Sequence, residues 1–217
     1  MIVRGARQLI ATLACTLLLA PAARADSASA DAAALATVEH ALAALDSVRA
    51  EFVQDLLNKE GKTAEHAVGV LYLKKPGRFR WDYSEPKQLI VSDGTRLWLY
   101  DPELEQATVR KVKDTLSQTP AMLLSGEAKV SDGYVVSAAG SAGGLDWVRL
   151  VPRKAEADFR ELKLGFAAGT LKRMEFADKL NQLTRVELTH IERNAHLADS
   201  LFQFVAPPGV DVIGPKG

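Results

Sequence analysis

The sequence predicts a mainly β (α+β) fold, namely a single incomplete antiparallel β-barrel of about eleven strands covered by a lid of short helices. Three observations predict it. Short segments with alternating side chains follow one another almost without interruption between residues 48 and 193. Turn residues such as Pro76-Gly77 and Asp93-Gly94 separate these segments. Finally, only two segments have clear helical spacing, and no change in composition marks a second domain.

The first 25 residues predict a cleaved signal peptide, which leaves residues 26–217 as the folded domain. Arg4 and Arg7 precede an apolar run over residues 9–20, which is shorter than the roughly 20 residues of a membrane span. Ala23-Arg24-Ala25 has the small-x-small pattern of a cleavage site. A retained anchor helix is the alternative, and the short run favours cleavage. We therefore expect a protein that works outside the cytoplasm.

The expected mature chain has 192 residues (217 − 25), no cysteine, and a net charge of −3 from 24 basic and 27 acidic residues. Cys15 lies inside the apolar run, and Thr12 stands where a lipoprotein signal would need Leu, so we do not expect a lipid anchor. Core packing alone must then stabilise the fold, which is feasible at this length. The near-neutral charge argues against nucleic acid as a partner, because such binding needs a basic surface.

The first predicted element of the domain is a helix over residues 31–46. Asp31 is suited to the N-cap position, and an apolar stripe wide enough to lie across a sheet follows it. The stripe consists of Leu35, Val38, Leu42 and Leu45.

Six strands are predicted next, each ended by turn residues. They lie in VRAEFVQDLL (48–57), HAVGVLYLKK (66–75), RFRWDY (78–83), QLIVSDG (88–94), TRLWLYDP (95–102) and LEQATVRKV (104–112).

A short helix is predicted over residues 119–126, because Thr119 suits its N-cap, Pro120 its first turn and Gly126 its end. Strands resume after it and fill the rest of the domain. They lie in AKVSDGYVVSA (128–138), LDWVRLVP (145–152), FRELKLGFAAG (159–169), LKRMEFAD (171–178) and NQLTRVELTHIER (181–193), before the tail SLFQFVAPPGVDV (200–212).

Alternation along the strand at 78–83 places Phe79, Trp81 and Tyr83 on one face. The strand at 96–101 is apolar on both faces. Two interpretations stay open from the residues alone, because such side chains either fill a solid core or line a hollow for an apolar ligand. The sequence has no nucleophile, zinc-protease or phosphate-binding motif, and its four histidines are scattered. We therefore expect neither an enzyme nor a metal site.

Several of these segments, in this order, resemble the LolA-type periplasmic carriers of outer-membrane lipoproteins. Each motif is weak by itself, and their order and spacing over essentially the whole expected domain are specific. The matching residues are Phe52-Val53-Gln54, Gly69 with Leu71, Lys75-Pro76-Gly77-Arg78-Phe79-Arg80-Trp81, the run from Ser92 to Thr108, Thr119-Pro120-Ala121 with Leu123-Leu124, and Phe202, Phe204 and Pro207-Pro208-Gly209-Val210.

The resemblance implies a monomeric, non-catalytic chaperone in the periplasm, and it also implies that no cofactor is bound. Such a carrier takes acylated lipoproteins from an inner-membrane ABC-type lipoprotein-releasing complex and delivers them to an outer-membrane lipoprotein receptor. Its half-barrel and helical lid enclose a cavity for the acyl chains. The cavity candidates in this sequence are Phe52, Leu71, Leu73, Phe79, Trp81, Tyr83, Leu97, Leu99, Met122, Leu123 and Leu124.

The resemblance also implies a basic residue that helps to hold the lid closed. In the family this residue precedes the proline of the motif and is usually Arg, whereas Lys75 stands there in this sequence. Lysine lacks the planar five-donor fork of arginine, so Arg78 and Arg80 are further lid-closing candidates. The functionally sensitive aromatic residue of the motif falls on Phe79. A binding module of the same superfamily that carries another lipid, or senses a protein or lipid partner, is the alternative function.

Overall fold

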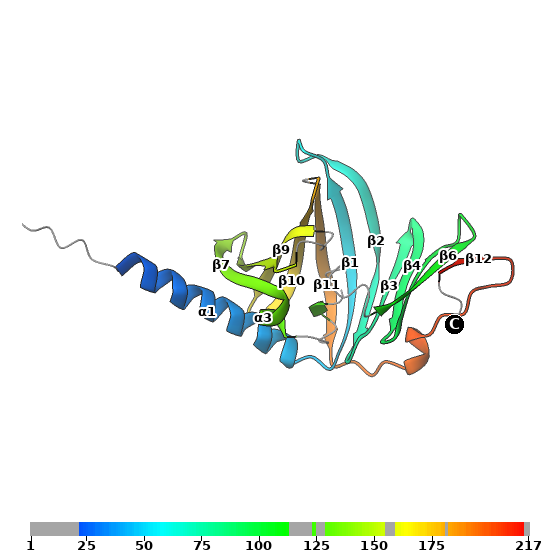
Figure 1. The fold of residues 1–217 in the computed structure, drawn as a ribbon, viewed down its shortest axis with the longest axis horizontal. Coiled ribbons are helices and arrows are strands. Elements are labelled where there is room, and N and C mark those ends of the chain that lie inside the picture. Colours follow the sequence, from blue (N-terminus) through cyan, green and yellow to red (C-terminus); the bar gives the residue numbers. More distant parts are fainter. Residues whose placement is uncertain (1–21, 113–122, 125–128, 155–158, 181, 215–217) are drawn as a thin grey trace, which may run out of the picture.

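One sheet of twelve strands forms the frame of the molecule (Figure 1). The computed structural model describes residues 22–112, 123–124, 129–154, 159–180 and 182–214. Its helical elements are α1 (Ala22–Ala43), α3 (Val130–Gly133) and the 3-10 helix η2 (Asp199–Phe202). Its strands are β1 (Ser47–Leu57), β2 (Thr63–Lys74), β3 (Arg78–Glu85), β4 (Lys87–Asp93), β5 (Arg96–Asp101), β6 (Gln106–Lys111), β7 (Tyr134–Ala142), β8 (Leu145–Pro152), β9 (Phe159–Ala167), β10 (Thr170–Asp178), β11 (Leu183–Arg193) and β12 (Asp211–Ile213).

The strand order is β12-β6-β5-β4-β3-β2-β1-β11-β10-β9-β8-β7. The chain therefore builds one wing from β1 to β6, crosses to the far edge at β7, and returns strand by strand until β11 pairs with β1. The edge strands β12 and β7 do not pair with each other in the described residues, so the barrel is incomplete, as predicted. The prediction of about eleven strands is confirmed, and the additional strand β12 spans only three residues of the tail and runs parallel to β6.

The first helix starts earlier than predicted. It begins at Ala22 and includes Asp31, so the assignment of Asp31 as N-cap was wrong. Alanine is the strongest helix former, and the Ala-rich stretch before Asp31 continues the helix. The Asp31 carboxylate instead accepts a hydrogen bond from the Ala138 amide of β7 at 2.9 Å, which fixes α1 to this edge strand. Among the described residues, no helix combines the length and the apolar character needed to cross a membrane.

Two further predicted elements differ in part. The strand expected over residues 128–138 begins only at Tyr134, because residues 130–133 form the single turn α3, whose Ser-Asp-Gly sequence favours a turn over a strand. Of the helix expected over residues 119–126, the structure describes Leu123 and Leu124, which are helical. The remainder lies outside the described residues.

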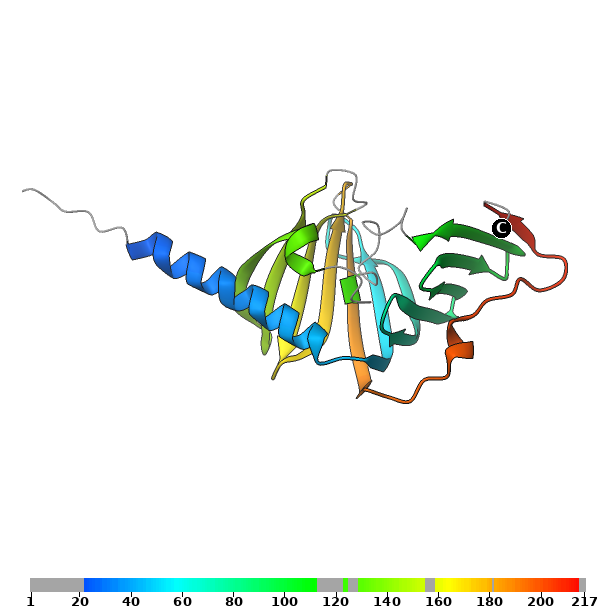
Figure 2. The same ribbon diagram turned by 60° about the horizontal axis from the view of Figure 1, so that its bottom comes forward.

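The sheet curves around the side on which α1 lies (Figures 1 and 2). We call this side the concave face, and it carries the main hydrophobic core, including Phe52, Leu71, Leu164 and Val186. The opposite, convex face has two parts. Over β1 and β8–β11 it is solvated and carries ion pairs between neighbouring strands, such as Arg149 with Glu161.

Over β2–β6 the convex face is covered by the C-terminal segment, residues 194–213, seen in orange and red in Figure 2. Phe202 is fully buried there, and the ring of Phe204 packs against Trp98 and Tyr100 with centroid distances of 5.2 Å each. Val91 is also fully buried on this side. Strands β2–β6 therefore lie between two apolar layers, the main core on the concave face and the C-terminal segment on the convex face.

Gly69 of β2 is required for the close packing of the concave face. A Cβ atom at this position would clash with the backbone carbonyl oxygen of Asp82. It would also lie 2.8 Å from two carbons of the Phe52 ring. We expect Gly69→Ala to lower the free energy of unfolding by about 1–3 kcal/mol, as overpacked core substitutions do. Gly133→Ala is the matched control, because a Cβ there has open space. Chemical denaturation measures both variants, and equal stability of the two would contradict this packing.

Candidate lipid-binding face

The wall of the concave face is built from residues that the strand register brings side by side. Leu73 of β2 pairs with Phe79 of β3, and Leu71 pairs with Trp81. On the other side of β2, Gly69 pairs with Phe52 of β1 and thereby leaves room for its ring. Alternation along these strands therefore gathers six predicted cavity residues on one face. All but Tyr83 are buried, namely Phe52, Leu71, Leu73, Phe79 and Trp81.

Three aromatic rings form a cluster at the centre of this wall. The ring of Phe52 lies 4.8 Å from that of Trp81 and 5.0 Å from that of Tyr83, measured between centroids. The Tyr83 hydroxyl donates a hydrogen bond to Oε1 of Gln54 at 3.2 Å. Burial raises the pKa of Tyr83 to about 12, and the Gln54 contact opposes this shift. The phenol is therefore neutral at every physiological pH, and the wall carries no charge here.

Helix α1 covers part of the concave face (Figure 2). Val38 is 0% exposed and Ala34 is also buried, while the other stripe residues Leu35, Leu42 and Leu45 are partly buried against the same core. The predicted stripe therefore faces the sheet. Leu123 and Leu124 are buried in the same cluster.

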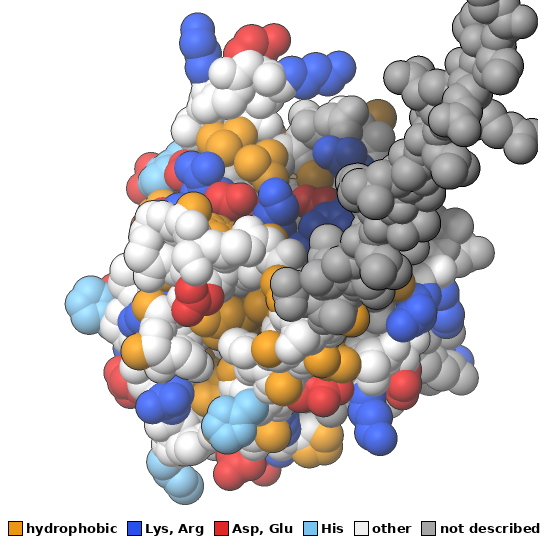
Figure 3. Space-filling view, turned by 90° about the vertical axis from the view of Figure 1, so that its left-hand side faces the viewer, with side chains coloured by type: hydrophobic (Ala, Val, Ile, Leu, Met, Phe, Trp, Pro, Cys, Tyr) orange, Lys and Arg blue, Asp and Glu red, His pale blue; other side chains and the backbone are white. Residues whose placement is uncertain are grey.

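A cavity of about 200 Å³ lies between the end of α1 and the sheet. It is bounded by Leu42 and Leu45 of the helix end, by Leu71 and Leu73 of β2, and by Leu124. Apolar residues of β9, β11 and the β9–β10 turn close the other side, and His40, Thr170 and Arg193 are its polar lining residues. Figure 3 shows the left-hand side of the molecule as drawn in Figure 1, where hydrophobic side chains lie among charged ones.

The predicted cavity residues divide into three groups. Leu71, Leu73 and Leu124 line the cavity, whereas Phe52, Phe79, Trp81, Leu97 and Leu123 are buried in the core beside it and Tyr83 packs against that core. Leu99 is 38% exposed and stays outside the core, because β5 lies towards the sheet edge, away from α1. Met122 lies outside the described residues.

Sequence reasoning missed the part of the cavity formed by the second wing. Leu164 and Phe166 of β9 line it together with Leu188 and Ile191 of β11. The alternation of Leu162, Leu164 and Phe166 was a detectable signal. It could not be assigned to the cavity, because only the pairing of β1 with β11 brings this wing next to β2.

Lys75 connects the sheet to the helix. Its Nζ donates a hydrogen bond to the backbone carbonyl of Leu42 in the last turn of α1. A cation is favourable at this end of a helix, where carbonyl groups lack partners within the helix. Burial lowers the pKa of Lys75, and the nearby Asp46 carboxylate partly opposes this shift.

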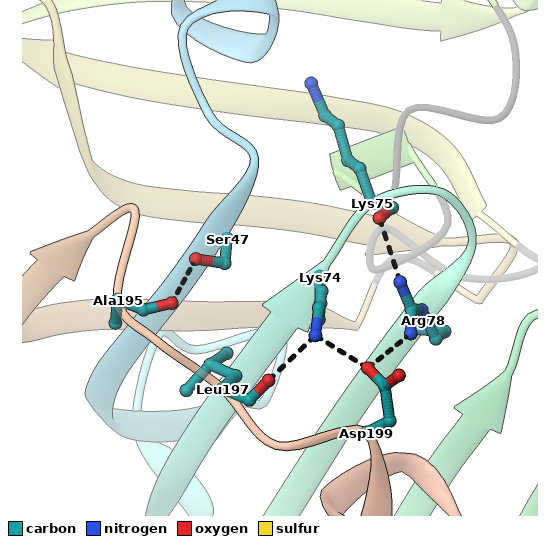
Figure 4. Close-up of polar contacts among 7 residues, drawn as sticks. All are labelled: Ser47, Lys74, Lys75, Arg78, Ala195, Leu197 and Asp199. Atoms are coloured by element: carbon teal, nitrogen blue, oxygen red, sulfur yellow. Dashed lines mark hydrogen bonds and ion pairs between the residues drawn. The ribbon is translucent and has the colours of Figure 1, made fainter.

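Arg78 and Arg80 lie elsewhere, which argues against their candidacy for lid closure. Strand alternation directs both to the convex face, where they bind the C-terminal segment. Arg78 pairs with Asp199 at 2.7 Å, and Arg80 donates to the Leu201 carbonyl at 3.3 Å. Figure 4 shows Lys75 directed away from Arg78 and Asp199. Neighbouring Lys74 also binds this segment, through Asp199 at 2.6 Å and the Leu197 carbonyl at 2.8 Å.

Asp199 gives the C-terminal segment an expected pH dependence. The hydrogen bond from Lys74, followed by the charges of Lys74 and Arg78, lowers the pKa of Asp199 below its ordinary value of 3.8. A lowered folded-state pKa means that its stabilisation is present above 3.8 and is lost as the pH falls through the folded-state value. We expect Asp199→Asn to lower the thermal midpoint at neutral pH and to converge with the wild type in acid. A constant difference at every pH would contradict this role.

No group of three or more His, Cys, Asp or Glu side chains that could hold a metal ion occurs within the described part of the chain. The concave face itself offers apolar surface, the phenols of Tyr83 and Tyr134, whose pKa values burial raises, and the indole of Trp81, which suit binding of an apolar ligand rather than acid–base chemistry.

Residues 43–205 match the family described as "Outer membrane lipoprotein carrier protein LolA". A protein of Methylococcus capsulatus named "Outer-membrane lipoprotein carrier protein" is 40% identical over 176 residues, which cover 79% of this chain and 85% of that protein. A protein of Methylibium petroleiphilum with the same name is 39% identical over 202 residues, or 93% and 96% of the two chains. An uncharacterized conserved protein of Thermus thermophilus shares the fold, with a TM-score of 0.52 at 15% identity over 84% of this chain and 97% of that one.

Proposed function

This chain belongs to the outer membrane lipoprotein carrier (LolA) family, and from that premise we propose that it is a periplasmic chaperone that holds the acyl chains of lipoproteins on its concave face. One observation carries the proposal for this molecule. An apolar wall with no described ionised group among its core residues is covered by a helix, and Lys75 joins the two at the end of the helix through its contact with Leu42.

We interpret the structure as the closed form, an interpretation that the size of the cavity supports. Its volume of about 200 Å³ is below the roughly 300–1,000 Å³ of typical small-molecule sites. Acyl chains therefore need α1 or the helical residues Leu123 and Leu124 to move away from the sheet. The motion uncovers the aromatic wall behind Leu71 and Leu73, so that residues buried in the closed form become the binding surface.

Two free energies compete in such a carrier, namely burial of the acyl chain and closure of the helix over the empty wall. Each methylene moved from water into the cavity contributes about 0.8 kcal/mol, so a long chain binds strongly. Closure of the empty protein buries the same wall against Val38 and Leu42 and competes with the cargo. The Lys75 hydrogen bond adds about 0.5–1.5 kcal/mol to the closed form and so favours release.

We further propose that an inner-membrane ABC-type lipoprotein-releasing complex loads the chain and that an outer-membrane receptor accepts its cargo. Purification from the periplasm of the native host, followed by mass spectrometry, tests the function. Triacylated or diacylated lipoproteins in the preparation would support it. A free lipid or a non-acylated protein partner would instead support the alternative of a binding module from the same superfamily.

A further inference from the structure

The indole of Trp81 is a buried hydrogen-bond donor without a partner. Trp81 is only 6% exposed, and its Nε1–H group has no acceptor within hydrogen-bond distance among the residues that the structure describes. Buried polar groups are nearly always paired, because an unpaired one loses its hydration without compensation. An indole has a single donor and no acceptor, so the Nε1–H group is the only hydrogen-bonding group of this side chain.

Two other polar side chains of the same wall, Tyr83 and Ser92, have hydrogen-bond partners, which sets Trp81 apart from them. Tyr83, packed next to it, donates to Gln54, and the buried Ser92 hydroxyl donates to the Gly77 carbonyl at 2.9 Å. The second unpaired buried nitrogen of the described residues, Nε of Arg173, is different in kind. It belongs to a guanidinium group that already binds Glu187, and this side chain is 33% exposed.

The position of Trp81 relates this donor to the ligand site. Its direct neighbour on β2 is Leu71, which lines the cavity, and its ring packs against Phe52. A ligand that fills the cavity beside Leu71 therefore comes next to the side chain of Trp81. An acyl chain carries one strong acceptor, the carbonyl oxygen at its head, and this oxygen needs a donor once it leaves water.

We propose that the Trp81 Nε1–H group binds the ester or amide carbonyl oxygen of an acyl chain, and so sets the depth to which the chain enters. This inference rests on the proposed carrier function. It adds a selectivity that burial alone cannot provide, because methylenes are identical in acyl and alkyl chains. The wall then distinguishes an acyl group from an alkyl ether of equal length.

Two synthetic lipopeptides test the inference, one with a diacylglyceryl group and one with the matching dialkyl ether, which lacks the carbonyl oxygens. We expect the wild type to bind the diacyl peptide about two- to tenfold more tightly, the range of one hydrogen bond. Trp81→Phe should remove this preference by weakening diacyl binding alone. Trp98→Phe, on the convex face, is the matched control and should keep it.

If the smaller Phe disturbs the fold, Trp81 can instead be replaced by benzothienylalanine. This residue keeps the shape of the ring, and a sulfur atom stands in place of the N–H group. Loss of the preference in that variant supports the inference. A preference that persists there, or a wild type that binds both peptides equally because water satisfies the donor, overturns it. A wild type that binds neither peptide contradicts the carrier function itself, so the two failures are distinguishable.

Discussion

Phe79→Glu is expected to abolish uptake of acylated cargo while the sheet stays folded. Phe79 is 1% exposed in the closed form and lies beside Leu73, which lines the cavity. Burial of an unpaired carboxylate costs several kcal/mol. The protein can avoid this cost by opening, which hydrates the carboxylate, and the open wall then repels acyl chains because their binding would bury the charge again.

Circular dichroism and a cargo-transfer assay separate the outcomes for this variant. A folded protein without cargo supports the carrier mechanism, and loss of the strand spectrum means that Phe79 acts only as core. Phe79→Leu is the control, since it keeps an apolar side chain and should retain uptake at a modest loss of stability. Normal transfer by Phe79→Glu would show that this wall does not hold the acyl chains.

Lys75→Leu is expected to tighten cargo binding and to slow its release. The substitution removes the hydrogen bond to the Leu42 carbonyl and leaves the apolar surfaces in place. The closed form loses about 0.5–1.5 kcal/mol, so cargo affinity should rise about two- to tenfold. Transfer to the receptor should slow accordingly, which a two-component transfer assay measures.

The neighbouring lysine provides a matched control for this experiment. Lys74 carries the same charge one residue earlier but binds Asp199 and the Leu197 carbonyl on the other side of the sheet. Lys74→Leu should loosen the C-terminal segment and leave cargo release unchanged. Lys75→Arg restores a donor at the helix end and should release cargo at the wild-type rate or faster. Release by Lys75→Leu at the wild-type rate would remove Lys75 from the closure mechanism.

Local patterns were sufficient to predict the class of fold and most strands. Alternation identified the face shared by Phe79 and Trp81, and turn residues such as Asp93-Gly94 marked the hairpins. Both predictions succeeded because each signal is contained within a few neighbouring residues. Helix capping was less reliable, because the side chain of Asp31 found a partner in Ala138, more than one hundred residues away.

The composition of the site depended on long-range pairing that no local pattern encodes. The contact of β1 with β11 brings Leu164 and Leu188 to the cavity. Alternation alone could not show that Leu99 lies where no described element covers the concave face. Arg78 and Arg80 were candidates for lid closure because arginine has the planar donor group that Lys75 lacks. Their face of β3 is opposite to that of Trp81, and the C-terminal segment that they bind approaches from the other end of the sequence.

Contact-dependent quenching of tryptophan fluorescence by brominated acyl chains tests most directly whether the concave face holds the cargo. Trp81 lies on that face, whereas Trp98 lies on the convex face against Phe204. Each is studied alone, in proteins whose other two tryptophans are replaced by Phe. A brominated lipopeptide should quench Trp81 and leave Trp98 unchanged. Quenching of Trp98 without quenching of Trp81 would contradict the assignment of the lipid-binding face.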